Sequence, residues 1–420
     1  MIHKKSWKYT IIKDDSYWCN NGYFRVKSLK DFSDVTKGDL GGYVRGFYNL
    51  SQRKNCWIYD EARVYGYAQV LGNAEVHDKA IVSDYARIFD NAIIKDSARI
   101  TGGAWIADNA QVSGVANVRE NAHVYCEVII TDNALVKGKA VISNKAKIFE
   151  NAVISDEVLI FDNAQVYGEV QVFGNAHVSG NAEVFGKVRV CGKAGILGEA
   201  KVYGNANIEG NAKILGKTLV SGKVNIFENP VIYGNSVISG DAKIYGDSQI
   251  SGNVKISGSA SVFGRAQVRG SATIDENASI YEDSIVSEKS YINGKAQIYG
   301  NARISGHAWI YGNAQICGNA EITDFSEIYG SSKISGDVLI SNIACISGET
   351  LEICDNVKII GDTIINGNIK ISNNTKVMGI IRKDKVTHIR NNWECLWALN
   401  EFKDFIRYSI KLVQLWINSI

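Results

Sequence analysis

The main feature of the chain is a hydrophobic position that recurs every six residues. Steps of six from Ile58 to Ile346 give 49 consecutive positions, and every one is Ile or Val. A period of six is neither the alternation of an ordinary strand nor the 3.6-residue period of a helix, but it is typical of hexapeptide β-helix repeats. The pattern therefore predicts a parallel β-helix in which three hexapeptides form one triangular coil.

A small residue lies two positions before each of these aliphatic residues. Of the 49 small positions, 33 are Ala, six are Ser and seven are Val, and the last three are Cys56, Thr218 and Pro230. Residues two apart in a strand point to the same side, so both positions are expected to face inward. Gly-Asn pairs such as Gly174-Asn175 supply the corners, because both residues tolerate a positive φ.

The repeat also sets the limits of the expected domains. After Ile346 the register slips by one residue and continues from Ile353 to Val377, which adds five hexapeptides and gives 54, or about 18 coils. We assign the β-helix to residues 56–381. Residues 1–55 lack the period and are expected to form a small β-rich cap, with strands in WKYTII and YFRVKSL. Such a cap would cover strand edges that otherwise aggregate.

Residues 382–420 have a different pattern. The segment RKDKVTHIR at 382–390 is interpreted as a basic linker, and apolar residues from Asn391 onward recur at helical spacing. They predict a C-terminal amphipathic helix that caps the last coil or joins subunits. Contact of this helix with a membrane is the alternative, because its apolar face is aromatic and a basic segment precedes it.

Composition narrows the function. Lys and Arg number 46 against 44 Asp and Glu, a net charge of +2, which disfavours nucleic acid as a partner. No run of 18 apolar residues occurs, so a soluble protein is expected. The eight cysteines form no CxxC pair and no zinc or disulfide framework, which indicates a reducing, cytoplasmic location and no metal site.

The N-terminal segment carries a more specific signal than the repeat. Residues 31–44 read DFSDVTKGDLGGYV, followed by Asn49-Leu50-Ser51 and by Cys56-Trp57-Ile58 at the first coil. With the GNA-type repeats, this segment resembles the YdcK-like hexapeptide-repeat proteins of bacteria and their prophages. The resemblance implies an all-β fold, a single-stranded left-handed parallel β-helix, which is shared with many trimeric acyltransferases. Members are often labelled as transferases by fold analogy, but function has to be argued from a site.

Little in the sequence points to catalysis. An acyltransferase on this fold needs a histidine base and a groove for coenzyme A, and no residue is inserted between 58 and 346 to build one. His77, His123 and His177 are expected to point outward as isolated side chains. His307, at a corner near Trp309 and Tyr311, is the single catalytic candidate.

Aromatic residues form the most regular surface signal. They occupy the position after the inward residue once in every three hexapeptides, which places one ring on each coil. One column comprises Phe149, Tyr167, Phe185 and Tyr203, and another comprises Phe227, Tyr245, Phe263, Tyr281 and Tyr299. Stacked rings either stabilise neighbouring strands or form an apolar strip for association.

These features favour a non-enzymatic, rigid β-helical scaffold that binds a protein partner or forms a homo-oligomer, as a dimer or trimer, through flat aromatic faces. No cofactor is expected. The first alternative is a CoA-dependent acyltransferase with an intersubunit site, which would use acetyl-CoA. The second is a structural or host-interaction protein of phage or prophage origin.

Overall fold

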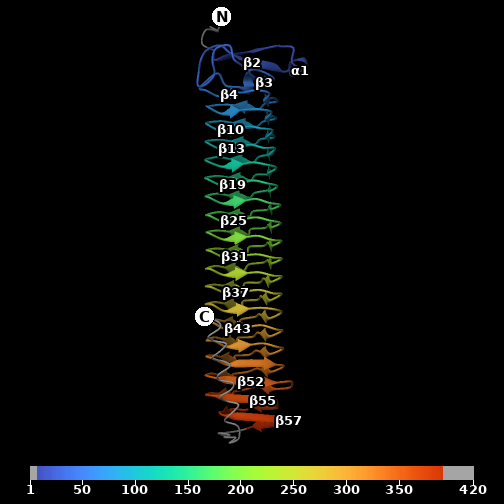
Figure 1. The fold of residues 1–420 in the computed structure, drawn as a ribbon, viewed down its shortest axis with the longest axis vertical. Coiled ribbons are helices and arrows are strands. Elements are labelled where there is room, and N and C mark those ends of the chain that lie inside the picture. Colours follow the sequence, from blue (N-terminus) through green and yellow to red (C-terminus); the bar gives the residue numbers. More distant parts are fainter. Residues whose placement is uncertain (1–6, 391–420) are drawn as a thin grey trace. The chain divides into compact units, whose positions relative to one another are not determined.

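The computed structural model describes residues 7–390, the side chains of 382–390 excepted. The chain divides into two compact units, Met1–Ser259 and Ala260–Ile420, and the described part of each contains a parallel β-solenoid (Figure 1). Together the units make about 19 turns, close to the number expected from the repeat. The predicted parallel β-helix is thus confirmed at the level of the all-β solenoid.

Unit 1 begins with the small β-rich cap expected for residues 1–55. Strand β1 (Tyr9–Ile12) pairs antiparallel with β2 (Phe24–Ser28), and β2 pairs antiparallel with β3 (Leu40–Val44). A short helix, α1 (Tyr17–Asn20), connects β1 and β2, and a 3-10 turn, η2 (Phe47–Asn49), follows β3. The two strands predicted in the cap are β1 and β2.

The cap also contributes to the solenoid, which the sequence did not predict. Strand β3 pairs in parallel with β5 (Arg63–Val64), aligning Val44 with Val64, and Leu50 forms a parallel bridge with Val70. Both offsets are longer than the three hexapeptides of a regular turn, so the hexapeptide count did not include this segment. This additional turn accounts for part of the difference in coil number.

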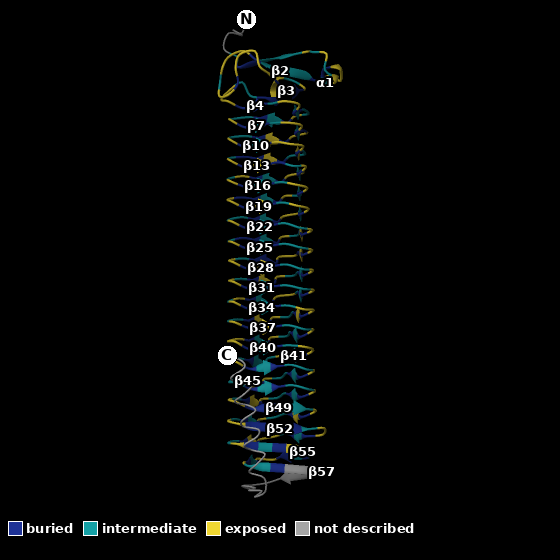
Figure 2. Cartoon of the chain, in the orientation of Figure 1, coloured by how far each residue is buried: buried dark blue, intermediate teal, exposed yellow. Residues whose placement is uncertain are grey.

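From β4 (Trp57–Ile58) to β37 (Lys255–Ile256), unit 1 consists of two-residue strands spaced six residues apart. Within unit 1, strands pair in parallel with the strand three hexapeptides away, as Val76 in β7 (Glu75–Val76) does with Ile94 in β10 (Ile93–Ile94). The inward Ile and Val side chains and the small residues two positions earlier are buried, as expected (Figure 2). The corners between strands hold most of the exposed residues.

The corner residues have positive φ, and many are acidic rather than glycine. Gly174 has φ +74°, but Asp84 and Asp96 adopt +61° and +58° at equivalent corners. Their carboxylates accept hydrogen bonds from the backbone N–H groups of Gly102 and Gly114, one turn later, at 3.0 and 2.8 Å. These two acidic corners therefore satisfy a backbone donor on the next turn, which offsets the cost of the left-handed conformation.

Unit 2 continues the same pattern from β38 (Ser261–Val262) and contains serines at several of the small inward positions. Ser284 and Ser290 are fully buried, and their hydroxyls donate to the carbonyls of Tyr281 and Ser287 at 2.7 Å. Serine can replace alanine here because the carbonyl three residues earlier accepts a hydrogen bond from the serine hydroxyl.

The predicted register slip lies in the later turns of unit 2. Ile334 in β50 (Lys333–Ile334) pairs with Ile353 in β53 (Glu352–Ile353), so this turn is one residue longer than three hexapeptides. Four strands in this part of unit 2 are longer than two residues, namely β49 (Glu327–Gly330), β52 (Ala344–Gly348), β55 (Thr363–Ser372) and β57 (Ile380–Arg390).

The C-terminal boundary needs a correction. Residues 382–390 were interpreted as a linker, but their backbone belongs to β57, which pairs in parallel with β55 over Ser372 and Arg390 among other positions. The backbone ladder continues although the hexapeptide pattern has ended, because strand pairing needs no particular side chain. The predicted C-terminal helix, from residue 391, lies outside the described residues.

Candidate functional site

The segment that carries the family resemblance has a structural role. Asn49 is fully buried, and its side-chain oxygen accepts hydrogen bonds from the N–H groups of Arg45 and Gly46, at 3.0 and 3.1 Å. Its amide nitrogen donates to the carbonyls of Gly66 and Ala68, at 3.2 and 2.8 Å. Asn49 thus joins the cap to the first turns of the solenoid and offers no free polar atom for chemistry.

The two glycines of the DLGGYV segment allow the cap backbone to approach the first turn closely. A Cβ atom on Gly41 would lie 2.4 Å from the carbonyl oxygen of Ile58, and one on Gly42 would lie 2.4 Å from that of Ala62. Neither distance can accommodate a side chain. These glycines are therefore required for the packing of the cap.

A buried lysine beside a cysteine is the most unusual group in the cap. Lys8 is 1% exposed, and its Nζ donates to the carbonyl of Cys56 at 2.6 Å and contacts the Cys56 sulfur at 3.4 Å. Desolvation lowers the pKa of Lys8, and burial raises the pKa of the Cys56 thiol despite the nearby lysine. A thiol whose pKa is raised is not an activated nucleophile, so this pair is a structural contact.

The outward histidines in unit 1 lie at separate positions and have aromatic neighbours. His77 stacks on Tyr59 with ring centroids 4.1 Å apart, and its Nε2 lies 3.0 Å from Glu75. His177 meets Phe161 edge to face at 6.4 Å. These contacts explain both side chains as parts of the outer face.

His307, the catalytic candidate in unit 2, is also next to an aromatic ring. It stacks on Phe325 at 4.8 Å, whereas Trp309, expected beside it, pairs with Tyr291 at 5.9 Å. Among the described residues, no carboxylate or hydroxyl forms a hydrogen bond with the His307 ring. Its catalytic role therefore remains a prediction.

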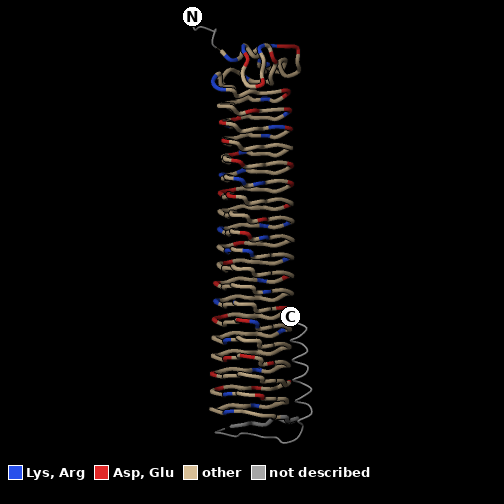
Figure 3. The backbone as a smooth tube through the Cα atoms, turned by 60° about the vertical axis from the view of Figure 1, so that its left-hand side comes forward, with Lys and Arg blue, Asp and Glu red and all other residues tan. Residues whose placement is uncertain are grey.

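The part of the chain that the structure describes also offers little for metal binding or for catalysis by carboxylates. No group of three His, Cys, Asp or Glu side chains that could hold a metal ion occurs there. The adjacent acids Glu282 and Asp283 have structural partners, since Glu282 accepts from the N–H of Gly300 at 2.8 Å and Asp283 pairs with Arg265 at 2.6 Å. Charges of both signs are interspersed along the turns of each unit (Figure 3).

The predicted aromatic columns are present within each unit as near-parallel stacks. In unit 1 the centroid distances are 4.5 Å for Phe149 and Tyr167, 5.0 Å for Tyr167 and Phe185, and 4.9 Å for Phe185 and Tyr203. The other column contributes one stack to unit 1 and two to unit 2. These pair Phe227 with Tyr245 at 4.7 Å, Phe263 with Tyr281 at 4.8 Å, and Tyr281 with Tyr299 at 5.0 Å.

The stacking changes what these columns offer to a partner. The interplanar angles in the first column are 7° or less, so each inner ring covers the faces of its neighbours. A partner would contact the ring edges and the tyrosine hydroxyls rather than open ring faces. Cross-strand stabilisation is therefore part of the role of these rings.

Several tyrosines in the fold resist ionisation, which predicts a loss of stability in alkaline solution. Burial raises the pKa values of Tyr9, Tyr59 and Tyr311 above the usual value of about 10. Hydrogen bonds to the carboxylates of Asp34 and Glu327 raise the pKa values of the last two further. The folded state thus keeps these protons at pH values where the unfolded chain loses them.

The protonated tyrosine hydroxyls make their full contribution to the free energy of unfolding below about pH 10. This contribution is lost as the pH rises further. We expect the free energy of unfolding to fall between about pH 10 and about pH 12, measured by urea denaturation at fixed ionic strength. The fall should be shallower in Tyr59→Phe. An equal slope in the two proteins would contradict this assignment.

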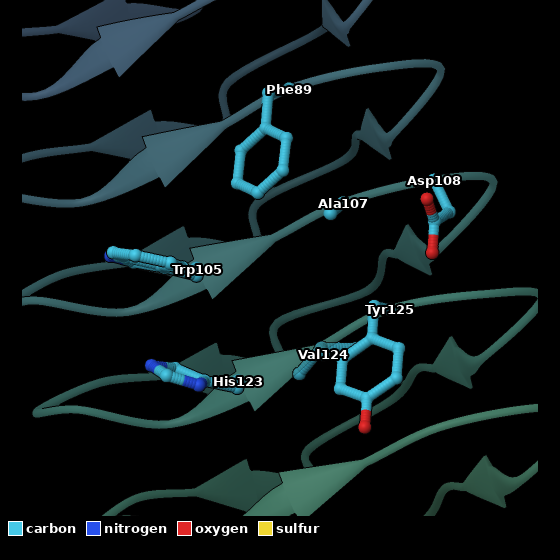
Figure 4. Close-up of a pocket in the computed structure, with 7 residues that line it drawn as sticks. All are labelled: Phe89, Trp105, Ala107, Asp108, His123, Val124 and Tyr125. Atoms are coloured by element: carbon cyan, nitrogen blue, oxygen red, sulfur yellow. The ribbon is translucent and has the colours of Figure 1, made fainter.

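A recess in unit 1 lies on the face formed by β9 (Arg87–Ile88), β12 (Trp105–Ile106) and β15 (His123–Val124). It is a hollow of about 300 Å³, lined by Phe89, Trp105, Ala107, Asp108, His123, Val124 and Tyr125 (Figure 4). Ala107 forms its floor between Phe89 on the preceding turn and Tyr125 on the following one. Trp105 and His123 lie on one side and Asp108 on the other.

Contacts on neighbouring turns hold the walls of the hollow. The Trp105 ring stacks on His123 at 5.0 Å, the Arg87 guanidinium lies 5.6 Å from its centroid, and Phe89 meets it edge to face at 6.2 Å. Trp105 nevertheless remains 41% exposed. The hollow is thus preformed and apolar, with one carboxylate and one imidazole at its sides.

The sequence carries only a weak signal for this site. The position after the inward residue carries Phe89, Ala107 and Tyr125 on three successive turns, so the signal was a single alanine between two aromatic residues. A continuous column stands out in a sequence, whereas a single alanine between two aromatic residues does not.

Within the described residues, no helix is both long and apolar enough to span a membrane.

Comparisons with known proteins point to the repeat. A model of the YdcK β-solenoid repeat matches residues 296–313, which lie in unit 2. The chain is also similar to a curated protein of Escherichia coli (strain K12) named "Uncharacterized acetyltransferase YdcK", with 34% identity over 59 residues. This alignment covers 14% of the chain and 18% of the relative, so the chain matches less than a fifth of the relative's length.

Proposed function

We propose, from the premise that this chain is a YdcK-like β-solenoid protein, that it is a non-enzymatic scaffold whose outward faces bind copies of itself or a protein partner. The observation that carries the proposal is the aromatic face of unit 1, where the rings of Phe149, Tyr167, Phe185 and Tyr203 stack in register on successive turns. Regularly spaced aromatic edges are typical of a surface that binds another protein.

The cysteines and the family resemblance add to this proposal. We place the protein in the cytoplasm, which is consistent with free thiols at all seven cysteines of the described residues. We also propose that the coil is left-handed, because the YdcK-like proteins that the chain resembles have a left-handed β-helix. The proposed function requires no cofactor.

The central rings of the unit 1 column provide the test. We expect the wild-type chain to form an oligomer in light scattering, and the double variant Tyr167→Ser and Phe185→Ser to weaken self-association at least about 30-fold, since aromatic residues dominate interface energies. Gln165→Ser and Glu183→Ser provide the matched control, because these residues lie two positions before Tyr167 and Phe185, in β22 (Gln165–Val166) and β25 (Glu183–Val184). A monomeric wild-type chain would refute self-association, and an unaffected double variant would exclude this column.

Acyl transfer is the second candidate, because the matched relative is named an acetyltransferase. This function would require an intersubunit site with His307 as the base. Saturable thermal stabilisation by acetyl-CoA, together with loss of acetyl transfer in His307→Ala, would replace the scaffold proposal. Absence of both effects in an intact oligomer would remove the candidate.

A further inference from the structure

The hollow around Ala107 lies between two aromatic side chains on the neighbouring turns. Phe89 and Tyr125 occupy the same outward position one turn before and one turn after Ala107. In the continuous columns of this protein, rings on successive turns lie 4.5 to 5.0 Å apart, which shows that the solenoid accommodates a ring on every turn. The methyl group of Ala107 leaves the space of one ring unfilled.

The sides of the hollow also carry unused polar groups. One carboxylate oxygen of Asp108 accepts a hydrogen bond from the N–H of Cys126 at 2.8 Å, which holds the carboxylate at the edge of the hollow. Among the described residues, no hydrogen bond reaches its other oxygen or the ring nitrogens of His123. An N–H donor on a bound ring would find an acceptor at Asp108.

We propose that this hollow binds the indole ring of a tryptophan side chain presented by a partner protein. Indole combines a flat apolar ring with a single N–H donor, which matches an alanine floor, aromatic walls and a carboxylate at one side. This inference rests on the proposed scaffold function and names the kind of side chain that it recognises.

The size and setting of the hollow favour a side chain over a free metabolite. Its volume of about 300 Å³ is at the lower limit for ligand pockets, and it is open to solvent, so a small molecule would keep much of its surface exposed. A tryptophan anchored on a protein gains the surrounding contact area as well. Tyr125, which lines the hollow and is 36% exposed, would contribute to that area.

N-acetyltryptophanamide is a direct probe of the hollow in the full chain. By saturation-transfer NMR we expect saturable binding with Kd on the order of 1 mM, as the small size of the probe allows. Filling the space with Ala107→Phe should weaken binding at least about 10-fold. The matched control is Ser155→Phe, which adds a ring after an inward residue on another face and should bind the probe as the wild type does.

A second pair of variants tests the N–H donor. Asp108→Asn removes the charge but keeps an acceptor for Cys126 and suits the positive φ of this corner. We expect the wild type to bind N-acetyltryptophanamide about 5-fold more tightly than its N1-methyl derivative, and Asp108→Asn to reduce this preference. Asp90→Asn, at the corresponding corner one turn earlier, should preserve it.

The outcomes separate this inference from the scaffold proposal. Probe binding that is unchanged in Ala107→Phe, or absent in the wild type, overturns the indole site, while the oligomer and its dependence on Tyr167 and Phe185 still decide the scaffold. If binding is confirmed and Ala107→Phe also dissociates the oligomer, the partner is a second copy of the chain. If binding is confirmed and the oligomer survives, the tryptophan belongs to another protein.

Discussion

Replacing Asn49 with alanine is expected to lower the free energy of unfolding of unit 1 by about 3 kcal/mol or more, because each buried backbone group left without a partner costs about 1 to 3 kcal/mol. The substitution removes four hydrogen bonds from a fully buried position. The change can be measured by urea denaturation followed through tryptophan fluorescence, to which Trp57 contributes as a buried ring in contact with Tyr9 and Phe32 of the cap.

Loss of the cap should also change the solution behaviour. Loosening of β3 would expose the edge of the first turn, and exposed strand edges template association. We therefore expect Asn49→Ala to form larger particles in light scattering. Asn91→Ala is the control, because Asn91 lies in an exposed asparagine ladder. Equal stability and particle size for the two variants would show that Asn49 does not hold the cap.

A second large effect is expected from the core of unit 1. Ile160 in β21 (Leu159–Ile160) is fully buried, and truncation to alanine should cost about 2 to 5 kcal/mol, because it removes buried methyl groups and leaves a cavity. The neighbouring Leu159 points outward and is only partly buried. Leu159→Ala should therefore cost less than about 1.5 kcal/mol.

Both variants can be compared by urea denaturation and by hydrogen exchange of the flanking strands. Because turns contact mainly their neighbours, protection should fall first around residue 160. A uniform loss of protection over unit 1 would instead indicate that the unit unfolds as one cooperative block. Similar costs for Ile160→Ala and Leu159→Ala would contradict the inward assignment.

The repeating part of the fold was predictable because one residue period determines it. Each inward Ile or Val and each preceding alanine has the same environment, so the expected positions are the buried ones. The register slip could be read from the sequence for the same reason, and Ile353 lies where the shifted count placed it. The limits of the solenoid were less predictable. Val44 and Leu50 join it with an offset that no repeat carries.

The site required information that a linear pattern does not contain. Trp105 is held by Arg87 and His123, and the shape of the hollow depends on how these side chains turn. The continuous columns could be predicted from residue numbers alone. Aromatic residues 18 positions apart lie on neighbouring turns, which brings their rings close together. An absent ring gives no positive signal, so the consequence of Ala107 became visible only with coordinates.

The pairing distance of three hexapeptides, which holds over most of the repeats, has a consequence for how such a chain can evolve. Duplication of a DNA segment that encodes three hexapeptides would insert one complete turn. Strands on either side of the insertion would still pair with a strand of the same kind three hexapeptides away, as Val76 pairs with Ile94. A duplication that does not encode whole hexapeptides would place outward residues in the interior. Length can therefore change in whole turns at little cost, which makes the number of surface positions adjustable by recombination.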